Sequence, residues 1–113
     1  MELKELISLQ QKFDGRHKTN FPWDQSISEN DLRMLEYLAL ALCGESGEVA
    51  NAVKKVIRGD ITYEQQREAV ISEIVDVLIY VMKFAYQMGF DLETAYHQKM
   101  EYNESKFRPY EHE

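Results

Sequence analysis

The chain of 113 residues is long enough for one compact domain and too short for a second core of useful size. Apolar residues make up 44% and charged residues 29%, a globular balance that excludes a disordered chain. Twenty acidic residues against thirteen basic ones give a net charge of −7, so no nucleic acid polymer is expected as a partner. If an acidic protein acts on an anionic substrate, a divalent cation is the usual reason for that pairing.

Cysteine usage and hydropathy exclude two further classes. Cys43 is the only cysteine, so neither an intrachain disulfide nor a cysteine-based zinc site is possible. The longest uncharged apolar stretch, residues 37–44, is far shorter than the about 20 residues of a membrane span. The N-terminal residues 1–5 mix charges at helical spacing and have no signal-peptide core. We expect a cytoplasmic protein with no membrane partner.

The first predicted helix follows an apolar stripe at helical spacing. That stripe is Leu3, Leu6, Gln10 and Phe13. We expect this helix to stop near Asp14 and Gly15. Residues 15–27 then form a loop, in which Phe21 and Trp23 are the large apolar residues.

The second predicted helix starts at one of two capping-box spacings, Ser26 with Glu29 or Ser28 with Asp31. It continues to about Arg58, where Gly59 and Asp60 supply a stop. Its seam alternates steps of three and four residues. The seam is Leu35, Leu38, Leu42, Glu45, Val49, Ala52 and Val56.

The third predicted helix begins near Tyr63 or Glu64, with Thr62 as its N-cap, and ends at Met88 and Gly89. We expect its core seam to be Ile71, Ile74, Leu78, Val81, Ala85 and Met88. Asp91 can cap a fourth helix from Leu92 to about Phe107, which Pro109 stops.

No segment alternates like a strand, and no internal repeat is visible. These elements predict an all-α bundle of four main helices joined by short connections. Residues 1–108 form its single domain, and residues 109–113 form a flexible tail.

Carboxylates interrupt the apolar pattern of both central helices. Glu45 lies on the core seam of the second helix and Glu48 follows one turn later, while Glu73 and Asp76 repeat this spacing on the third. A buried ionised carboxylate costs several kcal/mol unless it is paired or bound to a cation. Oxygen ligands of this kind suit Mg²⁺ or Mn²⁺.

Solvation, or pairing with Lys and Arg, is the alternative reading of these acids. It is the better interpretation for either pair alone. The occurrence of both pairs on consecutive apolar helices favours a metal site. Di-iron bundles use Glu-x-x-His motifs, but His17, His97 and His112 do not lie three residues after any of these acids. The more economical reading is therefore a magnesium site for phosphate chemistry.

Two polar stripes offer cationic groups for phosphates, although either stripe alone is usual for a solvated surface. On the second helix, Asn51, Lys55 and Arg58 follow Glu48. On the fourth helix the stripe is Lys99, Asn103 and Lys106.

Three segments together carry a resemblance to a known family. They are GESGEV at 44–49, ISEIVDVLIY at 71–80 and KMEYNESKF at 99–107. The chain resembles the all-α nucleoside triphosphate pyrophosphohydrolases, the MazG-like superfamily, and most closely its dCTP pyrophosphatase-like branch. The resemblance covers roughly residues 3–108, and the joint occurrence of the three segments makes it specific.

The resemblance implies a helical bundle that forms homodimers or homotetramers with the site near the subunit interface. It also implies hydrolysis of an NTP or dNTP between the α and β phosphates, with Mg²⁺ as cofactor and Mn²⁺ as a substitute. The implied metal-binding and catalytic residues are Glu45, Glu48, Glu73 and Asp76, and we assign the attacking water to Glu45. Lys99 and Lys106 match phosphate-binding positions, Asn103 and Tyr80 match sugar or base contacts, and Trp23 resembles a base-lining tryptophan.

Two departures limit the transfer of base preference. The chain between Trp23 and Glu45 is longer than in the dCTP-specific branch, and Gln10 stands where that branch has a histidine. Two other functions are open. One is a non-catalytic helical interaction module, and the other is hydrolysis of another diphosphate linkage, such as that of phosphoribosyl-ATP.

Overall fold

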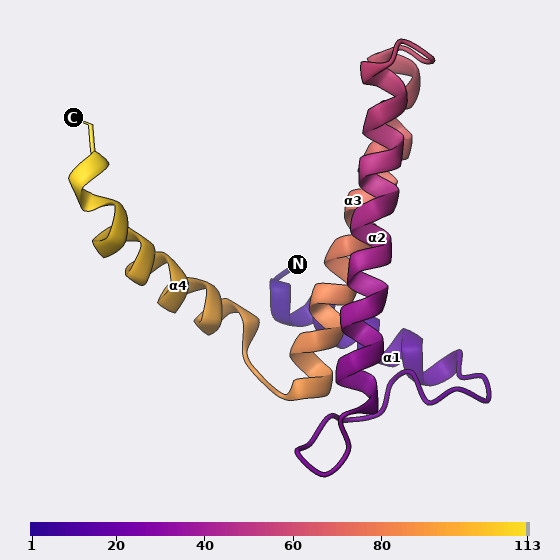
Figure 1. Ribbon diagram of the computed structural model, residues 1–113. Coiled ribbons are helices and arrows are strands. Elements are labelled where there is room, and N and C mark those ends of the chain that lie inside the picture. The colour runs from indigo at the N-terminus through magenta and orange to yellow at the C-terminus, as the bar shows by residue number, and fades with distance from the viewer. Residues whose placement is uncertain (113) are drawn as a thin grey trace.

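The computed structural model describes residues 1–112, which fold into helices joined by two short loops and by one longer loop, residues 17–32, between the first two helices. The elements are α1 (Leu3–Arg16), α2 (Arg33–Ile57), α3 (Tyr63–Met88), α4 (Leu92–Phe107) and the 3₁₀ helix η1 (Arg108–Tyr110). In Figure 1, α2 and α3 form a long antiparallel hairpin, α1 crosses its foot and α4 projects away from it. The all-α prediction of four main helices is confirmed for this part of the chain. The predicted tail begins within η1, and its last residue, Glu113, lies outside the described residues.

Most helix ends lie where the local sequence predicts them. The Thr62 hydroxyl accepts from the Gln65 backbone N–H at 3.2 Å, and the Gln65 side chain accepts from the Thr62 backbone N–H in return. Gly59 and Gly89 follow α2 and α3 with φ of 84° and 79°, a left-handed conformation that glycine adopts without a Cβ clash. Asp91 caps α4 by accepting from the Glu93 backbone N–H.

The predicted start of α2 is wrong for both capping frames. The helix begins at Arg33, after Leu32, which has no side-chain cap. The backbones of Ser28 and Asp31 instead exchange two hydrogen bonds, of 3.2 and 3.0 Å, in an isolated antiparallel bridge. The Asp31 carboxylate then accepts from the Arg33 backbone N–H at 3.3 Å, so the turn delays the helix by several residues. α1 is also longer than predicted and continues to Arg16.

The core is small and lies where α2 and α3 meet. Its buried apolar residues are Met34, Leu38, Ala52, Met82 and Ala85. The predicted α2 seam points inward, since each of its residues is buried or half-buried. The predicted α3 seam is wrong at four of its six residues, because Ile71, Ile74, Leu78 and Met88 are exposed. α3 is apolar nearly all round, and α2 covers only one of its sides. Apolar side chains on another side of α3 therefore remain exposed.

The isolated chain is extended for its length. Its radius of gyration is 17.4 Å, whereas a compact domain of this size has about 13 Å. α4 accounts for part of this difference, since it forms no extended packing interface with α1, α2 or α3. Over residues 1–112, every helix is too short or too polar to cross a bilayer.

A buried ionic network fastens α1 to α3. Asp14 on α1 is only 3% exposed, and its Oδ1 lies 3.2 Å from Nζ of Lys83, which is 8% exposed. The same oxygen accepts from Gln10 Nε2 at 2.9 Å, and Oδ2 accepts from the Tyr86 hydroxyl. These donors satisfy the buried carboxylate, as burial of a charge requires.

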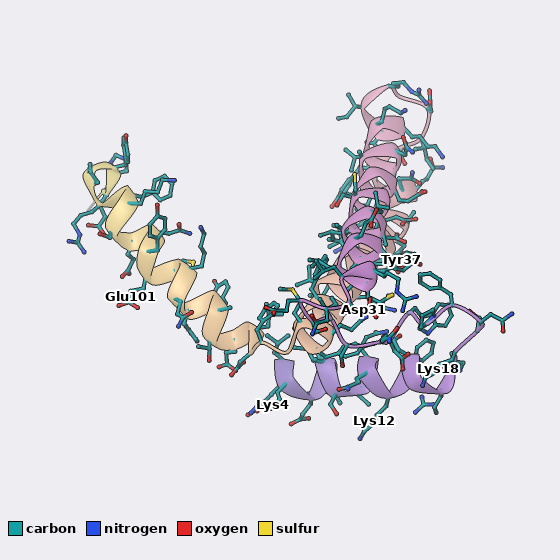
Figure 2. The ribbon with its side chains drawn as sticks, turned by 60° about the horizontal axis from the view of Figure 1, so that its bottom comes forward. Lys4, Lys12, Lys18, Asp31, Tyr37 and Glu101 are labelled. Carbon is teal, nitrogen blue, oxygen red and sulfur yellow. The ribbon has the colours of Figure 1, made fainter. Side chains whose placement is uncertain are left out.

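The loop between α1 and α2 is held along the end of α3. Gln87 Nε2 donates to the Gln25 carbonyl at 2.9 Å, and the Ile27 backbone N–H donates to the Gln87 carbonyl at 2.7 Å. Figure 2 shows this loop rising from α1, with Lys18 at its beginning and Asp31 near its α2 end. The loop thereby keeps Trp23 close to α1 and α3.

Breaking the buried pair should destabilise the protein strongly. Lys83→Met leaves the Asp14 charge unpaired, so we expect a loss of about 3–5 kcal/mol in the free energy of unfolding, measured by urea denaturation. The double variant Asp14→Asn, Lys83→Met removes both charges and should recover most of that loss. Arg58→Gln, at the exposed pair Arg58–Asp60, is the control and should change stability by less than about 1 kcal/mol. The two single variants are Lys83→Met and Asp14→Asn. If the double variant lost as much unfolding free energy as these two lose together, the charges would not stabilise each other and this interpretation would be wrong.

Candidate metal centre

Three carboxylates converge where α2 faces α3. Glu45, Glu73 and Asp76 each offer one oxygen, and these oxygens all lie within 4.8 Å of one another. Glu73 and Asp76 are three residues apart on α3 and therefore share a face. All three side chains are half-buried, which keeps them partly accessible from solvent.

The hairpin explains this convergence. Gly59 ends α2 and allows α3 to return antiparallel beside it. The side of α3 that meets α2 carries the acids and the half-buried Val77 and Tyr80. Packing fixes α2 and α3 relative to each other. It thereby holds the carboxylates of Glu45, Glu73 and Asp76 at the same level along the hairpin.

The described part of the chain, residues 1–112, pairs no lysine or arginine with this cluster. None of the ion pairs formed among residues 1–112 includes a carboxylate from either acidic pair. Partial burial raises the pKa of Glu45, and the charges of Asp76, Glu73 and Glu48 raise it further. Like charges at this separation repel, so the site is strained electrostatically in the absence of a positive ion.

Glu48 is the one predicted ligand outside the group of three. It lies one turn after Glu45 and is exposed, and its negative charge acts on Glu45. The structure therefore brings three of the four predicted acids together and leaves the fourth beside them.

The donor set fits a hard divalent cation. Mg²⁺ binds oxygen at about 2.1 Å, so two ligands on opposite sides of the ion are about 4.2 Å apart. The oxygens of Glu45, Glu73 and Asp76, all within 4.8 Å of one another, are close to that separation. A half-exposed rim also leaves room for the waters and substrate oxygens that Mg²⁺ retains.

Of the two predicted aromatic residues, Tyr80 lies beside this centre and Trp23 lies beside Lys83. Tyr80 follows Asp76 by one turn of α3, and burial, the neighbouring Tyr37 hydroxyl and the charge of Glu45 raise its pKa to about 12. Trp23 is half-buried, and its indole N–H donates to the Asp14 backbone carbonyl at 3.3 Å. The Lys83 Nζ lies 5.8 Å from the Trp23 ring centroid and 5.4 Å from that of Tyr80.

The predicted substrate-binding residues of α4 and of the second half of α2 are not gathered at the acids within one chain. Lys99, Asn103 and Lys106 lie on α4, which projects away from the α2–α3 hairpin (Figure 1). Both lysines approach the Tyr102 ring, with Nζ 5.0 and 6.0 Å from its centroid. Asn51 and Lys55 are exposed on α2, beyond Glu48.

Sequence reasoning missed the buried pair Asp14–Lys83. A signal was present, because Lys83 interrupts the apolar run at residues 81–85 in the way that Asp76 interrupts its own run. A search for charged residues within apolar helices therefore finds both Asp76 and Lys83. Asp14 gives no such signal, since it follows Phe13 near the end of a mostly polar helix.

Comparison with known proteins assigns the family. The model of the MazG nucleotide pyrophosphohydrolase domain matches residues 33–106, which is more than half of the chain and includes all four acids. The protein therefore belongs to the MazG nucleotide pyrophosphohydrolase family.

One curated relative and the solved structures complete the comparison. The gene 37 protein of Mycobacterium phage L5 is 42% identical over 64 residues, covering 54% of this chain and 55% of the phage protein. The chain thus spans about half the length of that relative. No solved structure matches the chain.

The acidic cluster predicts a metal-dependent and pH-dependent stability. Since the pKa of Glu45 is raised in the folded state, ionising it opposes folding as the pH rises from the ordinary carboxyl pKa through the raised one. Glu45→Gln should therefore raise the melting temperature of the metal-free protein at pH 8. Mg²⁺ should stabilise the wild type more at pH 8 than at pH 5, because protons compete with the ion for the carboxylates.

Differential scanning fluorimetry with and without Mg²⁺ measures both effects. Glu101→Gln is the matched control, since Glu101 is exposed on α4 (Figure 2). It should keep the full response to Mg²⁺, whereas Glu45→Gln should lose it. An equal Mg²⁺ response in the wild type and in Glu45→Gln would refute the assignment.

Proposed function

We propose that the protein is a Mg²⁺-dependent nucleotide pyrophosphohydrolase. It hydrolyses an NTP or dNTP between the α and β phosphates and yields the monophosphate and pyrophosphate. The observation that carries the proposal is the unpaired cluster Glu45, Glu73 and Asp76 in a chain of the MazG family. The finer resemblance, to the dCTP pyrophosphatase-like branch, belongs to this proposal, and Gln10 makes the base preference a question for a substrate panel.

Glu45, Glu73 and Asp76 would hold the ion, and Glu48 would complete the set from the next turn of α2. Mn²⁺ serves as a substitute, because it accepts the same oxygen ligands. When bound, the ion neutralises phosphate charge and polarises the phosphoryl group.

Glu45 orients the attacking water and accepts its proton. The position of Glu45 supports this role over that of a purely electrostatic carboxylate, because Glu45 comes from the helix opposite to Glu73 and Asp76.

The cationic and aromatic residues bind the rest of the substrate. Lys99 and Lys106 stabilise the charge on the pyrophosphate leaving group. Asn103 and Tyr80 contact the sugar or base, and Trp23 stacks on the base. Asn51 and Lys55 extend the polar surface beyond Glu48 towards the phosphates.

Self-association completes the site in this proposal. A homodimer or homotetramer covers apolar side chains that are open in the single chain, among them Ile74, which is 52% exposed, and Val75. A shallow groove of about 270 Å³ lies on the same surface, lined by Ser46, Val49, Ile74 and Val77. Assembly also brings the α4 lysines of the oligomer to the acids that they do not reach in one extended chain.

Pyrophosphate release across all NTPs and dNTPs tests the activity. We expect turnover with Mg²⁺ and none after EDTA. Asp76→Asn should lower kcat by about 100-fold or more, because several kcal/mol of transition-state charge stabilisation depend on the ion. Glu101→Gln should retain wild-type turnover.

Two other outcomes of this assay replace the proposal. Mg²⁺ binding without hydrolysis of any nucleotide would identify a non-catalytic helical interaction module. Turnover of phosphoribosyl-ATP alone would identify a hydrolase of another diphosphate linkage.

The oligomer is tested by sedimentation velocity. The wild type should sediment as a dimer or tetramer, and Ile74→Asp should shift it towards the monomer, because a charge opposes burial of that surface. Ile57→Asp is the control, since Ile57 is 81% exposed at the far end of α2. A monomeric wild type at high micromolar concentration would contradict the proposed assembly.

A further inference from the structure

We propose that the buried pair Asp14–Lys83 positions Trp23 and Tyr80 as the walls of the nucleotide-base site, and so determines how strongly the enzyme selects for a base. This inference rests on the proposed function. It assigns a role to the one buried ion pair found among residues 1–112.

Lys83 lies at the meeting point of both aromatic rings. Its Nζ is within 6 Å of the centroids of Trp23 and Tyr80, the range in which an ammonium attracts an aromatic face. The two rings come from different segments, the α1–α2 loop and α3. A single cation therefore fixes their positions relative to each other.

Asp14 fixes the other side of the arrangement. Its carboxylate holds Lys83 at 3.2 Å, and its backbone carbonyl accepts the Trp23 indole N–H at 3.3 Å. Gln10 and Tyr86 donate to the carboxylate as well, so Asp14 itself is held in place. Trp23 is thus restrained at its indole nitrogen by Asp14 and at its ring by Lys83.

Stability alone is a weak reason for this pair. Replacing a buried ion pair by apolar side chains is often neutral or stabilising, so a buried pair fits better with a geometric requirement. The ring positions are such a requirement, because an aromatic side chain that is already ordered loses less entropy when a base stacks on it.

The arrangement adjoins the metal centre. Tyr80 follows Asp76 by one turn, and the charge of Glu45 is among the causes of its raised pKa. A base between these rings would keep its triphosphate near the acids. Lys83 is buried and engaged with Asp14, so it acts through the rings and is a positioning residue.

The test compares a dNTP with base-free deoxyribose 5-triphosphate, which carries the same triphosphate. Lys83→Met should lower the ratio of the two kcat/KM values by about 10-fold, within the range of base–aromatic stacking. The loss should appear in KM for the dNTP, with kcat nearly unchanged. A role confined to folding would lower kcat/KM for both substrates alike and leave the ratio unchanged.

A double-mutant cycle checks that Lys83 acts through Trp23. Trp23→Ala should lower the same ratio, and adding Lys83→Met to it should have less effect than in the wild type. Full additivity would overturn the proposal. The variant Asp14→Asn, Lys83→Met covers the case in which the single variant does not fold. Lys12→Met is the control, because Lys12 is exposed on the outer side of α1 (Figure 2).

A readout without turnover separates this inference from the proposed function. Trp23 is the single tryptophan, so its fluorescence reports this contact directly. Acrylamide should quench Trp23 more strongly in the double variant than in the wild type or in Lys12→Met. Equal quenching would overturn the positioning role even if the enzyme is active. A protein that hydrolyses no nucleotide but shows the increase in quenching would refute the function and retain the positioning of Trp23.

Discussion

Mutual repulsion among three carboxylates is the constraint on which the account of this protein depends. Glu45, Glu73 and Asp76 place their oxygens within 4.8 Å of one another without a lysine or arginine partner in residues 1–112. Two long helices, packed along the core that contains Leu38, hold the acids there. In the proposed function, a divalent ion relieves this repulsion, and membership of the MazG family supports a nucleotide as the substrate.

Three groups of charged residues lie in separate parts of this structure. Around Asp14, opposite charges pair in the interior and fasten α1 and the Trp23 loop to α3. At the acidic cluster, like charges gather at a half-exposed surface. On α4, lysines gather around Tyr102, away from both. In the proposed function, the ion and the assembly of chains bring these three groups together around one triphosphate.

Local sequence signals predicted the helices and the acidic cluster, and tertiary packing decided the rest. Thr62, Gly59 and Gly89 marked helix ends correctly because capping and left-handed turns depend on a few neighbouring residues. The α2 start was wrong because Ser28 and Asp31 pair with each other in a turn. Periodicity did not show which side of the nearly all-apolar α3 meets α2, nor that α4 projects away. The pair Asp14–Lys83 joins residues distant in sequence, and only one of them gave a local signal.

The most direct test of the central claim is to locate a bound ion. Anomalous diffraction from crystals grown with Mn²⁺ measures its position independently of activity. The account predicts an anomalous peak within about 2.5 Å of carboxylate oxygens of Glu45, Glu73 and Asp76. A structure in which Mn²⁺ is bound elsewhere, or in which these three carboxylates are paired with lysine or arginine and hold no ion, would contradict it.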